Sequence, residues 1–485
     1  MKRLIIIILA AAILYLPSLS NFFSGDDFFH LGISRVGKLS EVLSFFSFEK
    51  NLHSASFYRP LPTQIFFFAG QVLFGLNPFG YHLLAIGFFI LTVILAYKLA
   101  EKLTNRSSAL LATFFYAFSV SHFVSLYWLS AFQELSLGVF YFGAAICWVN
   151  FLEKNKEGKH GLFFASAPYL SALLFFVLAL LSKETAATFP LIAILLAVFL
   201  KKWNLRQLVY LLPMFLIEAV YLYLRLAKFG GVAGESYIWD FSPRVLNTFF
   251  WYGLWGLGAP EMWVDFIGPK LAVNPFLLKY YGGESVIIFI SLGVFTVSAI
   301  YALIKFVFRV RNAYPLSHVF FGPLWFLFSS LPFLFLPWHK FPLELTVPLF
   351  GMAMFLGKLT GGFGKKTLAV ICFFYLLANV SSYLLTYRTH WVISRAKVAE
   401  RVVDYFKKTY PQFPESSVVY FYNDSAFIAE GWGASKQIAT AISGSDGLRV
   451  LYKNPEIKVF YEDFNEQPPE GKALIRLGSK EFLGY

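Results

Sequence analysis

Two adjacent carboxylates, Asp26 and Asp27, directly follow the first apolar segment of this chain. An ionised carboxylate is costly near hydrocarbon, so acidic residues at such an edge tend to face water or to take part in chemistry. A pair of this kind can accept a proton from a hydroxyl group or help to hold a cation. It can equally end a helix in solvent, and the local sequence does not decide between these two interpretations.

Cationic side chains occur in three short polar stretches that interrupt apolar sequence: Tyr58-Arg59-Pro60, Ser182-Lys183-Glu184 and Trp338-His339-Lys340. Arginine offers a fork of donors to phosphate, whereas lysine acts as a point charge. These stretches therefore suit an anionic ligand. Arg59 could otherwise be an interfacial residue whose charge reaches water, and Lys183 could form a local ion pair with Glu184.

The composition places these residues in a membrane protein. Of the 485 residues, 58% are hydrophobic and only 14% are charged, and the mean hydropathy is +0.61. Soluble proteins carry about 25% charged residues. The formal charge of +13 comes from Lys and Arg spread between apolar segments, so we expect no nucleic-acid partner. Cys147 and Cys372 both lie in apolar segments, which gives no basis for a disulfide or a thiolate metal site.

Hydropathy predicts an all-α polytopic fold with about 11 transmembrane helices. Their expected centres lie near residues 12, 88, 116, 142, 172, 192, 217, 294, 328, 350 and 376. The N-terminus resembles a signal peptide but lacks a small-x-small cleavage site, so we expect an uncleaved first helix that starts in the cytoplasm. The connections rich in Lys and Arg then fall on the cytoplasmic side, as the positive-inside rule requires: 98–106, 153–160, 201–206, 305–311 and 358–366.

Two regions outside the membrane are expected to carry structure of their own. The long first outer loop contains short amphipathic segments at 39–46 and 63–68, which are typical of helices lying at the membrane interface. From Arg388 onward the chain becomes more polar, with strand and turn patterns after a charged helical stretch. We therefore predict a transmembrane domain over 1–387 and a small extracytoplasmic α/β domain over 388–485.

The order of these motifs resembles the GT-C superfamily of glycosyltransferases, which use polyprenyl-phosphate-linked sugars. Its protein O-mannosyltransferase-like and aminoarabinose-transferase-like branches are the most similar. The likeness rests on Asp26-Asp27, Tyr58-Arg59-Pro60-Leu61, Asn77–Leu84, Gln133-Glu134 and Leu181–Glu184. It covers roughly residues 1–390 in architecture, and it depends on the order of the motifs because each one is short.

The resemblance implies roles for the charged residues of the outer loops. Asp26 is expected to be the catalytic base, and Asp27 to orient the acceptor or a metal. Arg59 and Lys183 are expected to bind the phosphate of the lipid, because negative charge builds on that leaving group as the glycosidic bond breaks.

Further residues complete the expected site. We assign Glu134, His339 and Lys340 to binding of the lipid phosphate or the sugar. Some GT-C enzymes bind a divalent metal through Glu and His, which Glu184 and His339 could do here. The sequence has no dense cluster of metal ligands, so the cofactor is left open.

These features predict an inverting glycosyltransferase in the cell (inner) membrane. It would move a sugar from a polyprenyl-phosphate carrier to a protein, lipid or glycan acceptor on the outer face, in contact with membrane lipids. A transporter or lipid flippase would also have many apolar helices, but it should show internal repeats and broken helices near the midplane. A non-catalytic scaffold is disfavoured by the charged residues of the outer loops. The sugar, the acceptor and the oligomeric state are not encoded in any motif.

Overall fold

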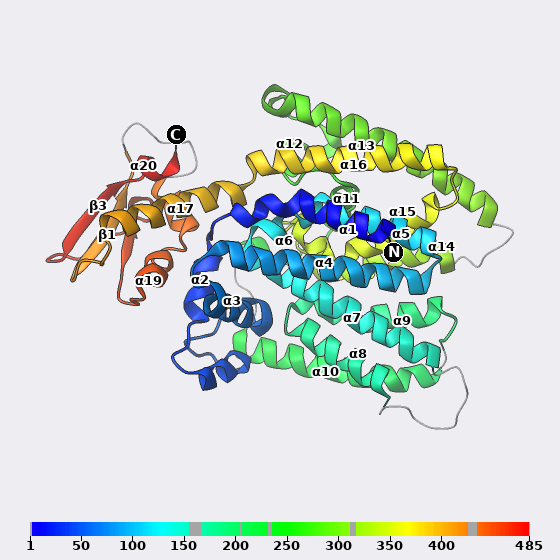
Figure 1. Ribbon diagram of the computed structural model, residues 1–485, viewed down its shortest axis with the longest axis horizontal. Helices are drawn as coiled ribbons and strands as arrows, with labels where there is room; N and C mark the ends of the chain where they lie inside the picture. The colour runs from blue at the N-terminus through cyan, green and yellow to red at the C-terminus, as the bar shows by residue number, and fades with distance from the viewer. Residues whose placement is uncertain are drawn as a thin grey trace.

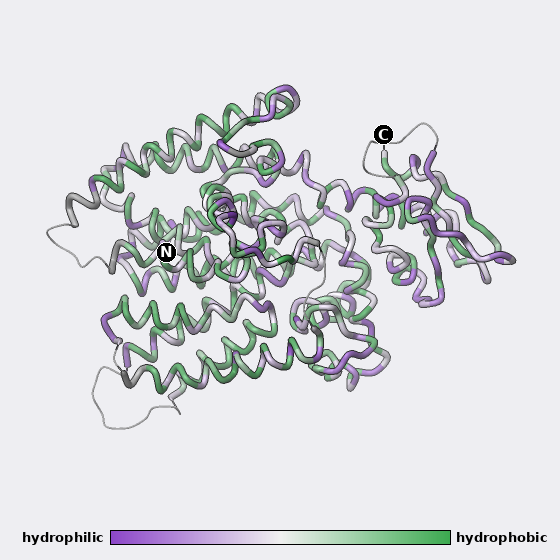
Figure 2. Tube along the Cα trace, turned by 180° about the vertical axis from the view of Figure 1, so that it is seen from behind, coloured by the Kyte–Doolittle hydropathy of each residue, from purple (hydrophilic) through white to green (hydrophobic). Residues whose placement is uncertain are grey.

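The computed structural model describes residues 2–154, 166–203, 205–230, 235–310, 317–424 and 434–484. Long helices form most of the chain, and a small sheet lies beside the helical bundle near the C-terminus (Figure 1). Hydrophobic residues predominate along the long helices, whereas hydrophilic residues are more frequent in the C-terminal part (Figure 2). The predicted all-α polytopic architecture with a small C-terminal α/β part is therefore confirmed.

Six helical segments in the described residues are long and apolar enough to cross a membrane, or seven if the bent pair α5–α6 is one span. Most of the bundle consists of α1 (Lys2–Tyr15), α4 (Pro78–Leu103), α5 (Arg106–Ala117), α6 (Phe123–Tyr127), α7 (Phe132–Lys154), α10 (Leu205–Phe229), α13 (Pro275–Val310) and α16 (Lys365–Thr389). Four more predicted spans are shorter apolar helices, namely α8 (Ala167–Leu180), α9 (Phe189–Phe199), α14 (Ser317–Leu334) and α15 (Pro348–Thr360). Every predicted centre thus lies in a helix.

Small residues allow the helices of the bundle to approach closely. A Cβ atom added to Gly351 of α15 would lie 2.5 Å from the carbonyl oxygen of Gly322 in α14. Gly357, further along α15, packs in the same way against the backbone of Ala112 in α5. Association of helices within a membrane depends on such close packing, since lipid is as apolar as the side chains.

The loop between α1 and α4 folds into short helices, as the sequence predicts. They are η1 (Leu16–Ser20), α2 (Asp26–Ile33), η2 (Leu39–Phe46), η3 (Leu61–Ile65) and α3 (Phe66–Phe74). Short turns also link the helices of the bundle: η4 (Val120–His122), η5 (Leu129–Ala131), η7 (Glu184–Thr188) and η10 (Pro342–Thr346). Between α10 and α13 lie η8 (Glu235–Tyr237), α11 (Arg244–Leu257), α12 (Trp263–Phe266) and η9 (Pro269–Leu271). The expected basic connections 153–160, 201–206 and 305–311 run into residues outside the described ranges.

The C-terminal part starts with α17 (Trp391–Thr409), which follows α16 after a single residue. Three parallel strands lie in the order β2-β1-β3, with Val419 opposite both Val459 and Ile475. The remaining elements are β1 (Ser417–Tyr422), α18 (Ala434–Ala441), α19 (Asp446–Tyr452), β2 (Val459–Tyr461), η11 (Glu462–Phe464), β3 (Ala473–Gly478) and α20 (Lys480–Leu483). This part touches the first loop, because the Gly25 amide donates to the Ala441 carbonyl at 2.7 Å.

Candidate functional site

The two carboxylates of the first loop begin α2, and their environments differ. Gly25 precedes them with a φ of 55°, a left-handed conformation that suits glycine. Asp27 is buried, and its carboxylate accepts hydrogen bonds from the Ser24 amide at 2.9 Å, the Ser130 amide at 2.7 Å and the Ser130 hydroxyl at 2.6 Å. Asp27 thus fastens α2 to the turn η5, directly before α7.

Asp26 is exposed and has no hydrogen-bond partner within the described part of the chain. Although the residue is exposed, the atoms packed around its carboxyl group reduce its hydration and raise its pKa above the usual value, and Arg395 of α17 opposes this shift. Carboxylates poised in this way are the groups that enzymes use as bases. Of the two acids, Asp26 is therefore the one that can meet a ligand.

A second set of charged side chains forms where α7, η3, η7, η10 and α10 meet. We call it the ionic cluster, and its members are Arg59, Gln133, Glu134, Lys183, Glu184, Arg225 and Glu344. Arg59 Nε donates to Glu184 Oε2 at 2.7 Å, and Arg59 also binds the Gln133 side chain. Arg225 Nε reaches the other oxygen of Glu184 at 3.3 Å. Glu184 is therefore held between two guanidinium groups.

Lys183 is buried and lies between two carboxylates. Its Nζ donates to Glu344 Oε2 at 2.6 Å and to Glu134. Burial alone would lower the pKa of Lys183, but Glu134 and Glu344 raise it above its usual value. Its ion-pair partners thus come from other elements, and the local pair with Glu184 that the sequence left open is not formed.

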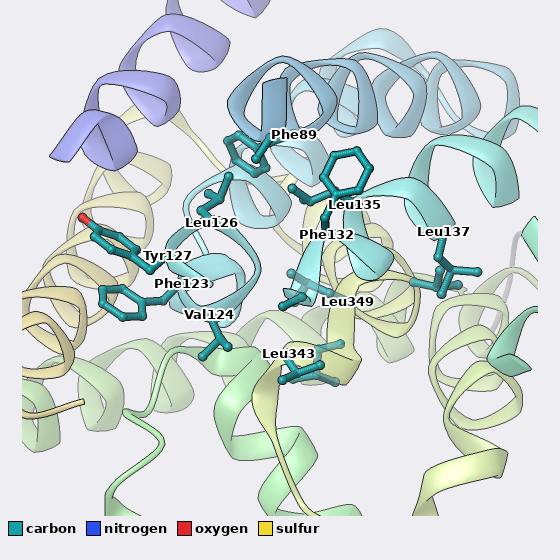
Figure 3. Close-up of a cluster of buried hydrophobic side chains, with 14 of the residues drawn as sticks. Phe89, Phe123, Val124, Leu126, Tyr127, Phe132, Leu135, Leu137, Leu343 and Leu349 are labelled. Carbon is teal, nitrogen blue, oxygen red and sulfur yellow. The ribbon is translucent and has the colours of Figure 1, made fainter. Parts of the chain in front are cut away.

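Apolar side chains surround these charges. Phe132 and Leu135 flank Glu134 on α7, and Leu343 precedes Glu344 in η10, and all three are buried. Figure 3 shows these side chains among those of α6 and its neighbours. Removal of water strengthens each ion pair and makes any unpaired charge expensive. The cluster is therefore held in a fixed geometry.

The α2 turn and the ionic cluster adjoin one another. The Asp27 partner Ser130 lies just before Gln133 and Glu134 on the same stretch of chain. His30, one turn after Asp26 on α2, is buried close to Arg59. Burial, with a smaller effect of the Arg59 charge, lowers the pKa of His30 to about 3, so this imidazole is neutral. Asp26 and the cations of the ionic cluster are thus carried by one continuous framework.

The two remaining predicted residues lie on either side of the loop before η10. His339 faces the ionic cluster, where its ring lies 4.1 Å from that of Tyr237, measured between centroids. Burial lowers the pKa of His339, while Glu344 acts in the opposite direction. Lys340 points elsewhere and donates to Asn247 Oδ1 at 3.1 Å. The structure therefore groups Arg59, Glu134, Lys183, Glu184 and His339 and leaves Lys340 outside.

Four participants were not predicted as site residues, namely Ser130, Gln133, Arg225 and Glu344. Arg225 had a usable signal, because a cation near the expected outer end of an apolar helix departs from the positive-inside rule. Gln133 and Glu344 lie near predicted residues in the sequence, whereas Ser130 had no signal, since its role depends on a contact with Asp27, 103 residues away along the chain.

The residues present do not fit the divalent metal that the sequence left open. Within the described ranges, no group of three or more His, Cys, Asp or Glu side chains could hold a metal ion. Both oxygens of Glu184 already accept from guanidinium groups. A metal at Glu184 would have to displace Arg59 and Arg225.

Residues 60–223 match the family of dolichyl-phosphate-mannose-protein mannosyltransferases. This segment contains the η3 turn, α7 with Glu134, and Lys183-Glu184. The resemblance to the GT-C glycosyltransferases is confirmed. The match supports the predicted membrane glycosyltransferase, and the comparisons give no support to a transporter or flippase. No curated protein matches the sequence.

The chain also matches solved structures at low identity. ArnT from Cupriavidus metallidurans bound to undecaprenyl phosphate is 12% identical, with a TM-score of 0.49 over 95% of this chain and 90% of that one. The Archaeoglobus fulgidus oligosaccharyltransferase in the apo form is 11% identical, with a TM-score of 0.47 over 94% of this chain and 64% of that one.

Proposed function

We propose that the protein is an inverting glycosyltransferase that moves a sugar from a polyprenyl-phosphate carrier to an acceptor hydroxyl. The observation that supports this most directly is one unpaired carboxylate, Asp26, on the same framework as three clustered cations, Arg59, Lys183 and Arg225. Such a reaction needs a base for the acceptor and positive charge for the departing phosphate. The family match over residues 60–223 supports a lipid-phosphate donor.

In the proposed step, the acceptor oxygen forms a bond to the anomeric carbon of the sugar. The bond from that carbon to the phosphate oxygen breaks, and its electron pair leaves with the lipid phosphate. The acceptor proton passes to the Asp26 carboxylate. A single displacement of this kind inverts the configuration at the anomeric carbon, and no oxidant or further reactant is needed.

The cations have donors to spare for a phosphate. Arg59 uses Nε and Nη1 in its contacts with Glu184 and Gln133, so within the described residues Nη2 has no partner. Lys183 has two carboxylate acceptors for its three protons. A phosphate oxygen can therefore join the cluster without displacing its ion pairs, and we assign the lipid phosphate to this position.

The same proposal assigns the orientation of the protein in the membrane and the roles of its two domains. The membrane is the cell (inner) membrane, the N-terminus is cytoplasmic, and the α2 end of the bundle faces outward. Residues 1–387 form the catalytic transmembrane domain, and residues 388–485 form an extracytoplasmic domain that rests on α2. The Gly25–Ala441 hydrogen bond and the approach of Arg395 to Asp26 support this arrangement. The acceptor is a protein, lipid or glycan.

Asp26→Asn tests the role of the base. Purified protein is incubated with radiolabelled polyprenyl-phosphate sugars and a membrane extract that supplies acceptors. We expect transfer to fall by about 10²–10⁴-fold, because that is the usual contribution of a general base. The matched control is Asp404→Asn, an exposed acid of α17, which should transfer at the wild-type rate. Undiminished transfer by Asp26→Asn would remove Asp26 from this role.

The pH dependence of transfer provides an independent check. A base acts only when ionised, so transfer should rise with pH as Asp26 loses its proton. Because the pKa of Asp26 is raised, this rise should occur at a higher pH than for an ordinary aspartate. Arg395→Gln should move it further upward, since the guanidinium lowers that pKa. An unchanged profile in this variant would contradict the assignment.

A further inference from the structure

A separate pocket lies between the segment around α12, the loop before η10, and the junction of α16 with α17. Its volume is about 470 Å³, which falls within the roughly 300–1,000 Å³ of small-molecule sites. The side chains that decide its chemistry are Glu261, Asp265, Trp338, Lys340, His390 and Trp391. Of these, only Lys340 was expected to bind a ligand, and the lipid phosphate is assigned elsewhere.

Polar side chains of the lining place hydrogen-bond acceptors at the wall of the pocket. Asp265 has no hydrogen-bond partner within the described part of the chain. Glu261 Oε2 lies 3.1 Å from His390 Nε2, which holds both side chains in place. Lys340 is anchored by Asn247 at 3.1 Å. The pocket therefore presents oriented oxygen and nitrogen atoms that suit hydroxyl groups.

Aromatic rings form the other part of the lining. Trp338 is 49% exposed, and Arg244 stacks on its ring with the guanidinium carbon 5.4 Å from the centroid. Trp391 packs edge-on against Trp128 at 5.2 Å between centroids. Indole rings provide flat apolar surfaces for the C–H faces of a sugar, while nearby carboxylates bind its hydroxyls. The combination is typical of a carbohydrate site.

The pocket shares its walls with both parts of the proposed active site. Trp338 and Lys340 line it, while His339 between them faces the ionic cluster. On the opposite wall, Trp391 is followed one turn later by Arg395, which stacks on the Trp391 ring and approaches Asp26. A molecule in the pocket would therefore lie next to both the cations and the base.

We propose that this pocket binds a neutral or amino-sugar residue of the acceptor. The assignment to the acceptor rests on the proposed function, whereas the sugar chemistry rests on the lining alone. Among the side chains that line the pocket, the carboxylates of Glu261 and Asp265 outnumber the single ammonium group of Lys340, so a phosphorylated or carboxylated sugar is disfavoured. The acceptor class is accordingly a glycan or the sugar headgroup of a glycolipid.

The test titrates purified full-length protein with glucose, glucosamine and glucose 6-phosphate, and binding is followed by saturation-transfer NMR without any donor. We expect saturable binding of glucose and glucosamine and at least tenfold weaker binding of glucose 6-phosphate. Trp338→Ala should weaken binding of both by at least tenfold. Asp265→Asn should reduce the preference for glucosamine over glucose severalfold, and because Asp265 is exposed this variant should fold.

Trp239→Ala is the matched control, because Trp239 is 56% exposed and does not line the pocket. It should bind the sugars as the wild type does. The proposal is overturned if neither sugar binds, if glucose 6-phosphate binds best, or if Trp338→Ala and Asp265→Asn bind like the wild type. Sugar binding without any transfer would overturn the proposed function alone. Transfer without sugar binding would overturn this pocket alone.

Discussion

The ionic cluster and the α2 turn both place carboxylates at the same end of the helical bundle, but they differ in pairing. In the ionic cluster, Glu134, Glu184 and Glu344 each contact a cation, and apolar side chains surround the group. In the α2 turn, Asp27 is buried and fully hydrogen-bonded, whereas its neighbour Asp26 is exposed and unpaired.

The difference separates groups that hold the site in place from groups that can react. A carboxylate with two or three fixed donors is occupied and contributes to stability, whereas an unpaired one remains available to a ligand. Substitutions among the paired groups should therefore mainly reduce stability, whereas substitution of the unpaired Asp26 should mainly reduce transfer. The predictions below follow the expected size of the effect on stability, beginning with the greatest.

Lys183→Met should cause the greatest loss of stability, about 3–5 kcal/mol, because it leaves Glu134 and Glu344 as uncompensated buried charges. Methionine keeps the length of the side chain, so the loss reports the charge rather than a cavity. The free energy of unfolding is measured in detergent by titration with SDS.

Two further variants serve as controls for this result. Lys183→Arg keeps a cation between the carboxylates and should recover most of the stability. Lys102→Met breaks the exposed pair with Glu153 and should cost less than about 1 kcal/mol. Equal losses for Lys183→Met and Lys102→Met would mean that the buried ion pairs of the ionic cluster contribute no more to stability than an exposed ion pair.

Asp27→Asn should change how stability depends on pH. Burial raises the pKa of folded Asp27 from 3.8 to about 7, although the hydrogen bonds from Ser130 and Ser24 oppose the shift. The folded state then binds the proton more tightly than the unfolded state. This contribution to stability is complete below about pH 4 and is lost as pH rises through about 7, at about 1.4 kcal/mol per pH unit in between.

Between pH 5 and pH 8, the wild type should therefore lose about 2–3 kcal/mol that Asp27→Asn does not lose. Thermal unfolding across this range measures the difference. Asp404→Asn should keep the wild-type slope, because its carboxylate is exposed. A wild-type slope in Asp27→Asn as well would show that Asp27 is not the buried acid that titrates.

Gly25→Ala should cost about 1–2 kcal/mol, because a Cβ atom is disfavoured at a φ of 55°. The new atom would lie 3.4 Å from the Thr440 carbonyl oxygen, an ordinary van der Waals contact, so the cost comes from the backbone conformation. Gly32→Ala on the same helix meets nothing within 4 Å and should be neutral or slightly stabilising. The difference in melting temperature between the two variants checks this, and its absence would argue against the positive φ of Gly25.

Much of the architecture follows from properties that act locally along the sequence. Apolar runs of sufficient length predict helices, and each of the predicted centres lies in one. The run of β-branched and aromatic residues over 418–422 likewise predicts the strand β1. Helix lengths were less predictable, because α8, α9 and α15 are shorter than a full span requires.

The candidate site was harder to predict from the sequence, because it depends on contacts between residues that are far apart along the chain. Residue types identified Asp26-Asp27, Arg59 and Lys183, yet no local feature distinguishes Asp26 from Asp27. That distinction depends on Ser130, 103 residues further along the chain. Lys340 looked equivalent to His339, but successive side chains of this loop point to different sides.

Asp26→Asn should have the smallest effect on stability, within about 0.5 kcal/mol of the wild type, since no described residue hydrogen-bonds to the side chain. The same substitution is expected to abolish most transfer, so Asp26 and Asp27 should respond in opposite ways although they are adjacent. Unfolding measured at a single pH, alongside the transfer assay, gives both values. A large loss of stability in Asp26→Asn would show that both acids stabilise the turn. The α2 turn would then not differ from the ionic cluster in the pairing of its carboxylates.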